Sequence, residues 1–492
     1  MPSICFVTDD FVGAVRNGGI GTHFLLMGRL LAGHGWDVHV MYCGPVEDEE
    51  ALTAMRAQLA VDGVSFSRLE DFPPPVWHGI EHFGDGWSTL ANSQRAFEAL
   101  ESLHATRRFD IIEFSDWRAL GFRAVQAKRA GLAFADTRLA VKLHSTTQWQ
   151  RRGNLENRQS PWELKVEYCE RYAFEHADLQ LSPSRYMLAD TRGEGWAVRD
   201  DAVVAYPFPA RRGAAAPPAA PIRELVFFGR LERRKGLDLF LDALDDIDDD
   251  LPVLFLGRDG FIEGRRASAL IAERIGPRPH RIETELARDA AIAELLRGDR
   301  LAIIASRAES FGFTVAECIA DEVPFLATRA GAIPEVLAHD AARERWLFDP
   351  DAGALAAAVR RRLAAPPDEE HALRAAAAAA CDPDAWNRRV EETYRALAAR
   401  PAGPRARPAG DAPATVSVCV TYHDHPQYLP TALASLAAQT RPADEVLVID
   451  DGSVDDSWQL LVARAATDAR LRLLRHPTSA GQSTSIWQAA RF

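Results

Sequence analysis

Short runs of β-branched and other apolar residues alternate with helical patterns along most of the chain, and this alternation restricts the possible folds more than any other feature. The segments between the runs have the apolar spacing of helices. Strands that alternate with helices in this way are typical of parallel sheets covered by helices, so the sequence predicts an α/β fold. The strand-like runs occupy residues 4–8, 38–42, 139–143, 225–228, 253–256 and 301–305.

Two segments rich in proline and alanine, residues 206–224 and 400–414, interrupt this alternation and divide the chain into three blocks. In parallel sheets, ligands bind beyond the carboxyl ends of the strands, so we expect the site in a cleft between the first two blocks. The predicted division is a first domain at 1–205, a hinge at 206–221, a second domain at 222–382, a terminal helix at 383–399 that crosses back to the first domain, a linker at 400–414 and a last segment at 415–492.

The composition excludes some classes of protein. The chain has 492 residues and a formal net charge of −13, because 70 acidic residues outnumber 57 basic ones. This balance argues against a nucleic-acid partner, which needs clustered cations. The cysteines are scattered without paired spacing, which predicts neither disulfides nor a zinc site. No apolar run reaches the ~18 residues of a membrane span, so the predicted location is the cytoplasm, with peripheral association at the inner face of the membrane left open.

The first candidate motif is a glycine-rich segment at residues 17–23, between the first strand and the following helix. Glycines at such a turn allow backbone amides to approach a ligand closely, and Gly19 and Gly21 are the residues that we expect to do so. A simple tight turn is an equally good interpretation of this segment taken alone.

The second candidate follows the strand at residues 225–228. Arg230 comes directly after that strand, and Lys235 precedes the next helix. An arginine fork and a mobile lysine charge suit a diphosphate whose negative charge grows as a sugar leaves it. Because Arg233 and Arg234 lie in the same segment, a solvated basic loop is the alternative.

The third candidate lies between the strand at 301–305 and the helix that follows it. Glu309 and Glu317 are eight residues apart and lie on either side of the predicted start of that helix. The turn Ser310, Phe311 and Gly312 exposes backbone amides that can hold a phosphate. A carboxylate one turn into the helix can bind the vicinal diol of a ribose. The alternative, a favourable helix-terminal acid and an ordinary surface acid, is the weaker interpretation.

Together these segments resemble the retaining glycosyltransferase family 4, over roughly residues 1–398. The resemblance implies the GT-B fold, two Rossmann-like domains with a cleft between them. It also implies that Arg230 and Lys235 bind the donor diphosphate, that Glu317 binds ribose and that Glu309 contacts the donor sugar. His144, at a strand end, fits the position of a family histidine near the reacting sugar. The implied catalytic set is His144, Arg230, Lys235 and Glu309, and the implied donor-binding set is Gly19, Gly21, Arg230, Lys235, Glu309, Ser310, Phe311, Gly312 and Glu317.

The last segment resembles the start of the inverting glycosyltransferase family 2, which has a GT-A fold. Its second strand ends in Asp450 and Asp451, which the resemblance places at the nucleoside. We expect this GT-A-like segment to be incomplete and catalytically silent, because it has no Asp-X-Asp metal motif and no later carboxylate base. The residues 423–425, His-Asp-His, could suggest a metal, but without a third spaced ligand a surface turn is favoured. No metal site is predicted anywhere in the chain.

The function that these resemblances imply is retaining, metal-independent transfer of a sugar from a nucleoside-diphosphate sugar to a saccharide or lipid-linked acceptor. Bacterial surface polysaccharide synthesis is the expected context, from the pairing of two transferase types. No cofactor is expected, since the sugar nucleotide is a substrate. A non-catalytic nucleotide-sugar-binding protein, a sugar phosphorylase and a nucleotide-sugar epimerase remain alternatives, because the same fold serves all of them.

Overall fold

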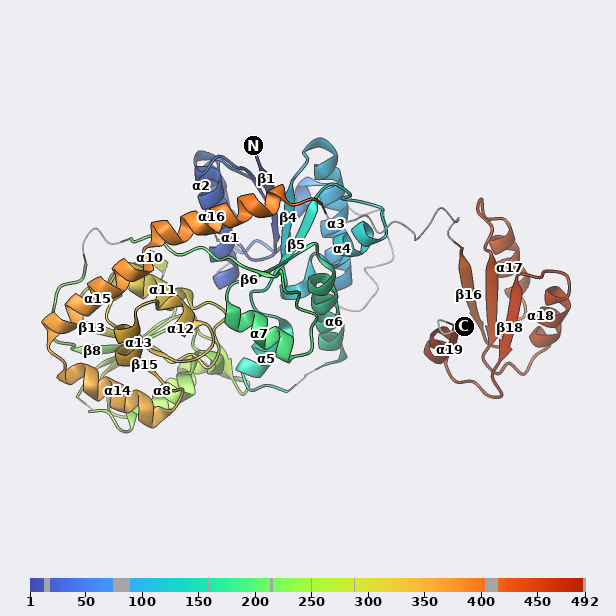
Figure 1. Cartoon of the computed structure of the whole chain (residues 1–492). Coiled ribbons are helices and arrows are strands. Elements are labelled where there is room, and N and C mark those ends of the chain that lie inside the picture. Colours follow the sequence, from blue (N-terminus) through green and yellow to red (C-terminus); the bar gives the residue numbers. More distant parts are fainter. Residues whose placement is uncertain are drawn as a thin grey trace. The chain divides into compact units, whose positions relative to one another are not determined.

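The computed structural model describes residues 1–12, 18–73, 89–157, 160–212, 216–248, 250–286, 288–402 and 415–489. The chain forms two compact units, Met1–Ala406 and Arg407–Phe492 (Figure 1). Asn17 of the glycine-rich segment, residues 213–215 of the predicted hinge and residues 403–414 of the predicted linker lie outside the described residues.

The first domain of the larger unit is built on a parallel sheet in the order β3-β2-β1-β4-β5-β6-β7. On β1, Ile4 and Phe6 pack into one apolar cluster, while Cys5 and Val7 pack into another. A strand with alternate side chains in two cores is buried on both faces, which explains its continuous apolar sequence. The strands are β1 (Ser3–Thr8), β2 (Asp37–Tyr42), β3 (Val64–Arg68), β4 (Ile111–Ser115), β5 (Arg138–Lys142), β6 (Leu179–Ser182) and β7 (Val203–Val204).

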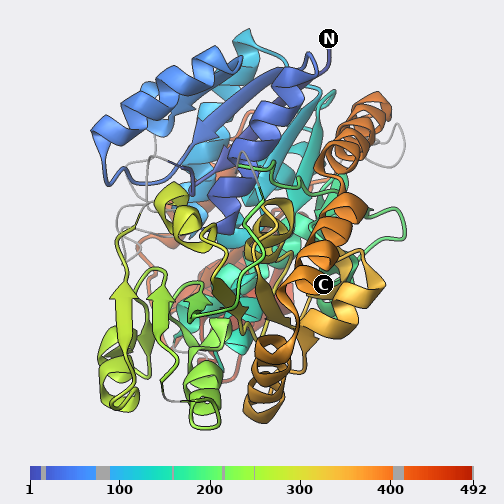
Figure 2. The same ribbon diagram turned by 90° about the vertical axis from the view of Figure 1, so that its left-hand side faces the viewer.

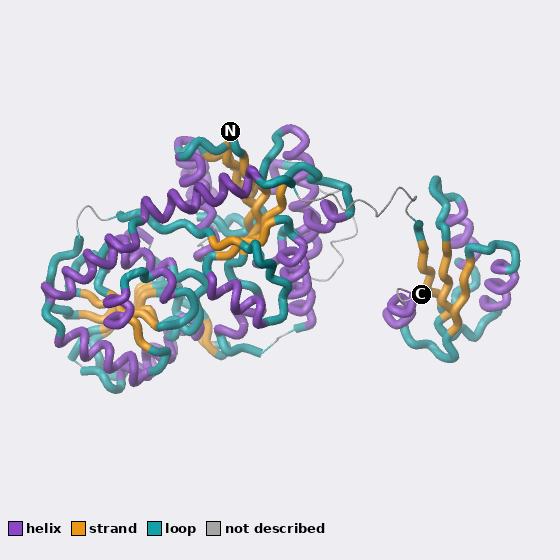
Figure 3. Tube along the Cα trace, in the orientation of Figure 1, coloured by secondary structure: helices purple, strands orange, loops and turns teal. Residues whose placement is uncertain are grey.

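Helices cover both faces of this sheet, as Figure 3 shows. The first of them, α1, begins at Gly19 without a side-chain cap, immediately after the described end of the glycine-rich turn. The helices of this domain are α1 (Gly19–Gly33), α2 (Glu49–Val61), α3 (Thr89–Thr106), α4 (Phe122–Arg129), α5 (Thr147–Gly153), α6 (Pro161–His176) and α7 (Arg185–Gly193), with short 3-10 turns η1 (Leu69–Asp71) and η3 (Trp117–Ala119).

The second domain repeats the plan with a parallel sheet in the order β12-β9-β8-β13-β14-β15 and a small antiparallel hairpin, β10-β11. Its strands are β8 (Glu224–Phe228), β9 (Val253–Leu256), β10 (Phe261–Ile262), β11 (Arg265–Arg266), β12 (His280–Glu283), β13 (Arg300–Ile304), β14 (Phe325–Thr328) and β15 (Leu347–Phe348). Its helices are η4 (Arg233–Lys235), α8 (Leu237–Leu244), α9 (Ala267–Arg274), α10 (Arg288–Leu295), α11 (Phe313–Ala320), α12 (Ile333–Val336), α13 (Asp340–Trp346), α14 (Ala352–Ala364) and α15 (Pro367–Cys381).

A long helix, α16 (Pro383–Ala399), follows α15 and extends along the first domain, as Figure 1 and Figure 2 both show. Asp382 caps its start by accepting hydrogen bonds from two backbone amides of the first turn. Tyr394 and Leu397 are buried in the apolar cluster that contains Ile4 and Phe6 of β1. Trp386 packs against the clusters of both domains. The terminal helix therefore belongs to the cores of both domains.

The smaller unit contains a parallel sheet in the order β16-β17-β18. Its elements are β16 (Ser417–Tyr422), α17 (Leu429–Ala437), β17 (Glu445–Asp450), α18 (Ser457–Ala465), β18 (Leu471–Arg475) and α19 (Gln482–Ala489). The predicted α/β class is thus confirmed, with two parallel Rossmann-like sheets and a third, small parallel sheet. None of the described helices is both long enough and apolar enough to cross a membrane.

Candidate functional site

Several of the predicted site residues of the larger unit lie where its two domains touch. The backbone of Gly19, at the start of α1, is so close to α11 that a Cβ there would lie 3.6 Å from the ring of Phe313. Ser184 of the first domain donates a hydrogen bond of 2.7 Å from its hydroxyl to the carbonyl of Ser310. Residues from the glycine-rich turn and from the Ser310 turn, far apart in the sequence, therefore meet between the domains.

A buried ion pair lies in the second domain at this boundary. Lys235 Nζ is 2.5 Å from Glu309 Oε1, and Ser306 Oγ donates to the same carboxylate at 2.7 Å. Burial acts to raise the pKa of Glu309, but the nearby Lys235 and Arg234 outweigh it and lower this pKa. Burial also lowers the pKa of Lys235, although Glu309 opposes the change. Strands β8 and β13 are neighbours in the sheet, and this adjacency brings the two side chains together.

Arg230 differs from its neighbours by being accessible. Its side chain is 47% exposed, and its nearest recorded acid is Glu232, at 3.4 Å. Arg233 and Arg234 also carry carboxylate partners, Glu263 and Glu232 respectively. The segment is therefore neither a uniformly solvated basic loop nor a fully neutralised one, because the Arg230 cation is about half exposed, near the buried Lys235.

Two glycines that we did not single out allow this packing. Gly236 has φ 75° and lies so close to β13 that a Cβ would overlap the carbonyl oxygen of Ala305. Gly331 has φ 60°, and a Cβ there would overlap the backbone of Glu309. Both conditions favour glycine over any other residue. In the sequence, Gly236 could have been recognised from its place between Lys235 and an apolar helix, at a predicted helix start.

The helix α11 begins at a left-handed glycine. Gly312 has φ 96° and precedes the helix without a side-chain cap. Glu317 lies in the second turn and is 3% exposed. Its carboxylate is paired with the guanidinium of Arg212, from the hinge, and the backbone amide of Arg212 donates to Asp321 Oδ1 at 2.6 Å. The predicted ribose-binding acid is therefore already engaged by a cation that sequence reasoning missed.

The same helix ends in an unusual conformation. Glu322, two residues after the end of α11, adopts φ 54°. A left-handed conformation is costly for a residue with a side chain, so the surroundings must hold it. Arg374 donates to the carbonyl of Glu322 at 2.8 Å, and Arg211 pairs with its carboxylate at 3.0 Å.

His144 follows β5 and is buried, with 2% of its surface exposed. Its backbone amide donates to Asp116 Oδ1 at 2.9 Å, and its Nδ1 lies 2.9 Å from the hydroxyl of Tyr206. Burial, with smaller contributions from His23 and Lys142, lowers its pKa well below the usual value, so the imidazole is neutral. Burial raises the pKa of Asp116 to about 7. Nε2 of His144 has no hydrogen-bond partner among the residues that the structure describes.

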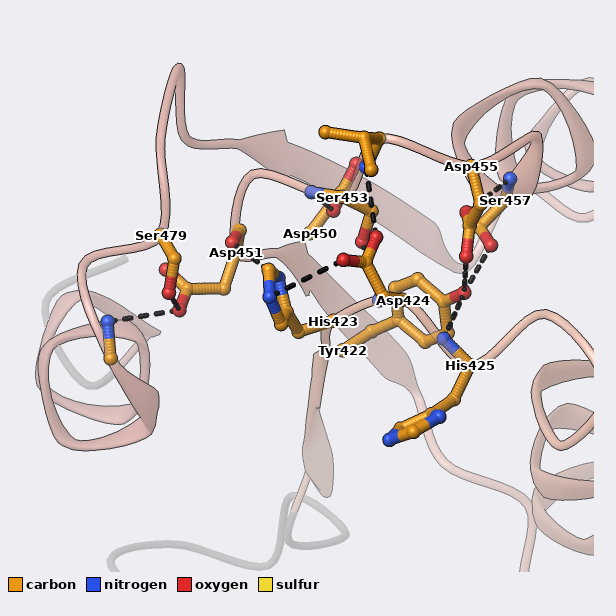
Figure 4. A network of polar contacts seen from close by, with 12 residues as sticks. Tyr422, His423, Asp424, His425, Asp450, Asp451, Ser453, Asp455, Ser457 and Ser479 are labelled. Carbon is orange, nitrogen blue, oxygen red and sulfur yellow. Dashed lines mark hydrogen bonds and ion pairs between the residues drawn. The ribbon is translucent and has the colours of Figure 1, made fainter.

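In the smaller unit, Asp450 and Asp451 lie at the end of β17 as predicted, but both are engaged by their own unit. Asp450 accepts from the amide of Ser453 at 2.8 Å and lies 3.1 Å from Arg475. The carboxylate of Asp451 accepts from the amides of Ala480 and Gly481 and from the hydroxyl of Ser479, the last of which Figure 4 shows. Its Oδ1 is also 2.6 Å from Nδ1 of His476.

The residues 423–425 form part of the same polar network (Figure 4). Asp424 accepts from the amide of Val454 at 2.8 Å, and His423 Nδ1 lies 2.9 Å from the carbonyl of Asp451. Within the described ranges, no cluster of three or more histidine, cysteine, aspartate or glutamate side chains is arranged to hold a metal ion. The polar side chains here connect the ends of two neighbouring strands.

Comparison with protein families agrees with this geometry. The model described as glycosyl transferase 4-like domain matches residues 18–209, and the model described as glycosyl transferases group 1 matches residues 222–365. The model described as glycosyl transferase family 2 matches residues 417–492. No curated protein matches the chain by sequence.

Solved structures share the fold of the larger unit. Sucrose-phosphate synthase from Thermosynechococcus elongatus is 19% identical with a TM-score of 0.60, over 81% of this chain and 99% of its own. Anabaena HepE in complex with UDP and glucose is 16% identical with a TM-score of 0.57, over 80% of this chain and 100% of its own. The lipopolysaccharide outer core galactosyltransferase WaaB is 12% identical with a TM-score of 0.53, over 80% of this chain and 99% of its own.

These matches confirm the GT-B architecture that the resemblance implied, with two Rossmann-like domains in the order expected. The candidate residues follow the carboxyl ends of strands, where ligands bind in parallel α/β sheets. The chain therefore belongs to the family 4, or group 1, glycosyltransferases of the GT-B fold, and it continues into a segment of the glycosyltransferase family 2 type.

Proposed function

We propose that this protein transfers a sugar from a nucleoside-diphosphate sugar to a saccharide or lipid-linked acceptor with retention of anomeric configuration. The buried pair of Lys235 and Glu309, with the accessible Arg230 beside it, is the observation that carries the proposal. It combines cations for a leaving diphosphate with a carboxylate for the sugar at one domain boundary.

Arg230 and Lys235 would bind the donor diphosphate. The planar fork of arginine and the point charge of lysine both stabilise phosphate oxygens, and the uncapped start of α11 at Gly312 adds backbone amides. These groups bind the diphosphate most strongly when the sugar leaves and the negative charge on the diphosphate grows. They therefore stabilise the transition state more than the bound substrate, which lowers the barrier.

Glu317 would accept hydrogen bonds from the two hydroxyls of the ribose. Both carboxylate oxygens can accept, which suits a vicinal diol. Arg212 pairs with this carboxylate in the present structure, so a ribose must share Glu317 with Arg212 or displace it. Glu317 therefore contributes to donor affinity rather than to the chemical step.

Glu309 and His144 would orient the sugar. During front-face transfer the bond between the anomeric carbon and the phosphate oxygen breaks while a bond to the acceptor oxygen forms on the same face. The proton of the acceptor hydroxyl passes to the departing phosphate oxygen, so no nucleophile from the protein is required. Hydrogen bonds from fixed side chains stabilise the oxocarbenium-like sugar between these events. We infer bacterial surface polysaccharide synthesis as the context, from the combination of two transferase types in one chain.

The first test is a thermal-shift screen against nucleoside diphosphates and their sugars. UDP-glucose is the first donor to try, because HepE of Anabaena was solved in complex with it. A ligand at 100 times its dissociation constant adds ~2.7 kcal/mol of stability, so the correct donor should stand out. Lys235→Met should reduce the shift, whereas Arg233→Met, which alters a neighbouring cation paired with Glu263, should retain it.

The second test is catalytic and separates this proposal from its alternatives. We expect nucleoside diphosphate to be released only when an acceptor is present, and NMR of the product to show the donor's anomeric configuration. Binding without turnover would indicate a sensor, phosphate-dependent sugar release a phosphorylase, and conversion of the donor sugar without acceptor an epimerase. A covalent glycosyl adduct trapped on Glu309 or Glu317 would contradict the front-face mechanism.

A further inference from the structure

The hinge between the two domains holds Tyr206 in a fixed position. Its carbonyl accepts a hydrogen bond of 2.8 Å from Nε1 of Trp386 on α16. Two residues further on, Phe208 exchanges two backbone hydrogen bonds of 2.9 Å with the side-chain amide of Asn387. On the other side, the amide of Ala205 donates to Ser182 at the end of β6. The backbone of residues 205–208 is thus fastened to the first domain and to α16.

The ring of Tyr206 lies between side chains of the two domains. It stacks on His23 of α1 with centroids 4.3 Å apart and an interplanar angle of 19°. The ring centroids of Phe311 and Phe313, at the start of α11, lie 4.8 and 5.2 Å from the ring centroid of Tyr206. Tyr206 is 4% exposed, so its ring has little freedom to move.

The hydroxyl of Tyr206 lies 2.9 Å from Nδ1 of His144. Burial keeps the pKa of Tyr206 well above its usual value, so the phenol retains its proton. Among the described residues, the structure records no other hydrogen-bond partner for this hydroxyl. If Nδ1 carried the imidazole proton, both the phenolic proton and the lone pair of the buried Nε2 would lack a partner, whereas with the proton on Nε2 only the Nε2–H group lacks one. The favoured arrangement is therefore donation from Tyr206 to Nδ1.

A neutral imidazole has one N–H group, so an accepting Nδ1 places the proton on Nε2. Nε2 is the nitrogen that has no partner among the described residues. A buried N–H without a protein acceptor is ready to donate to a bound ligand, and sugar hydroxyls are suitable acceptors.

We propose that Tyr206 is a positioning residue for His144: its hydroxyl holds the imidazole in the tautomer whose Nε2–H donates to the donor sugar. The inference rests on the role proposed above for His144. Tyr206 acts only through the imidazole, and its ring contacts with His23, Phe311 and Phe313 keep the hydroxyl in place.

The variant Tyr206→Phe tests this inference because it keeps the ring and removes only the hydroxyl. We expect kcat to fall about tenfold, with the donor KM changed by less than about twofold. The matched control is Tyr394→Phe, which removes another fully buried hydroxyl, one that donates to Glu113 at 2.5 Å rather than to His144. Its kcat should stay within about twofold of wild type. Unchanged kcat in a folded Tyr206→Phe protein would overturn the inference.

A double-mutant cycle with His144→Ala shows whether the two residues act together. We expect Tyr206→Phe to have no further effect on kcat once His144 is absent. If the two losses multiply instead, Tyr206 acts independently of His144 and the inference is wrong. If His144→Ala leaves kcat unchanged, the proposed catalytic role of His144 is wrong. The NMR measurement described next then tests the tautomer by itself.

The tautomer is measurable without activity, by ¹⁵N NMR of the full chain labelled at histidine. The signals of His144 are those missing from the spectrum of His144→Ala. We expect wild-type His144 to carry its proton on Nε2 and Tyr206→Phe to lose this preference. A proton found on Nδ1 in the wild type would overturn the inference even if Tyr206→Phe failed to fold.

Discussion

The GT-B site and the aspartate site of the smaller unit use carboxylates in opposite ways. Glu309 and Glu317 are held by Lys235 and Arg212, long cationic side chains that come from other segments. Asp451 is held instead by backbone amides and by the side chains of His476 and Ser479, all from the loop after β18. A long cationic side chain can be shared with a phosphate or released to it, whereas a backbone amide cannot move away without unfolding its loop.

The comparison indicates how to recognise an acid that is available to a ligand. Each of these acids lies in the loop after a strand or in the helix that follows that loop, so their sequence positions look equivalent. Their partners separate them: a partner that can move leaves the carboxylate exchangeable, and a partner fixed in the backbone makes it part of the fold. The predictions below test this distinction, starting with the largest expected effect.

Lys235→Met should have the largest effect. Loss of the cation removes charge stabilisation of the leaving diphosphate and leaves Glu309 buried without its ion-pair partner. We expect kcat/KM to fall about 10³-fold, in the range for removing a preorganised electrostatic group. Steady-state kinetics with the donor found in the screen measures it. Arg233→Met is the control, since removal of this cation should change kcat/KM by less than about threefold. An equal fall in kcat/KM in both variants would favour a general effect of the basic segment.

Glu309→Ala and Glu317→Ala should separate chemistry from binding. We expect Glu309→Ala to lower kcat about 100-fold with a smaller change in KM, because its carboxylate is the one proposed to contact the reacting sugar. Glu317→Ala should raise the donor KM about tenfold and leave kcat near wild type. Initial rates over a range of donor concentration, with calorimetric donor affinities, distinguish the two. Equal losses of affinity in both variants, with kcat unchanged at saturating donor, would overturn this division.

Asp451→Asn should affect the structure of the smaller unit and leave transfer unchanged. Hydrogen bonds from the Ala480 amide and then from His476 lower the pKa of Asp451 below its usual value. Because this pKa is lower in the folded state, the ionised carboxylate stabilises the folded state at pH values above its unfolded pKa of about 4. The contribution is lost as the pH falls through the folded pKa. Hydrogen exchange of peptides covering residues 476–481 at pH 7 should be about tenfold faster in the variant.

The matched control for that experiment is Asp468→Asn. The pKa of Asp468 is lowered to about 2 by hydrogen bonds from the side chain and then the backbone of Arg470, a neighbour in sequence. Its loss should leave exchange at residues 476–481 unchanged. Faster exchange there in both variants would mean that the Asp451 loop is not held locally, and loss of transfer in Asp451→Asn would show that the smaller unit contributes to activity.

The smallest expected effect is that of removing the smaller unit or adding a chelator. A chain ending at Ala402 keeps α16 and the contact between Arg400 and Asp201. We expect its transfer rate, with and without EDTA, to stay within about twofold of the full chain, because Arg230 and Lys235 supply the charge that a metal would otherwise provide. Loss of transfer on chelation, or on truncation with an unchanged melting temperature, would contradict this prediction.

Much of the fold could be predicted from sequence because it rests on local patterns. The apolar run at residues 4–8 and the helical spacing after Gly19 specify a strand and a helix wherever they occur, and both are found. The positions of the candidate residues at strand and helix ends followed for the same reason. Arg230 and Glu309 could be proposed as candidates because such ends face the ligand in parallel α/β sheets, whereas His144 was proposed from the family resemblance.

The partners of those residues could not be predicted in the same way. Arg212 and Glu317 are 105 residues apart, and Tyr206 and His144 are 62 apart, so no local pattern relates them. Similarly, nothing near Asp451 in the sequence indicates that the amides of Ala480 and Gly481 bind its carboxylate.

The sequence by itself determined the α/β class and supplied the candidate residues for a sugar nucleotide, because periodicity and the chemistry of side chains are local properties. Only the tertiary structure decided which carboxylate meets a mobile cation and which meets fixed amides, and which nitrogen of His144 meets Tyr206. Those pairings depend on the relative placement of strands β5, β8 and β13 with the hinge and α16, which packing of the whole unit sets and no short segment encodes.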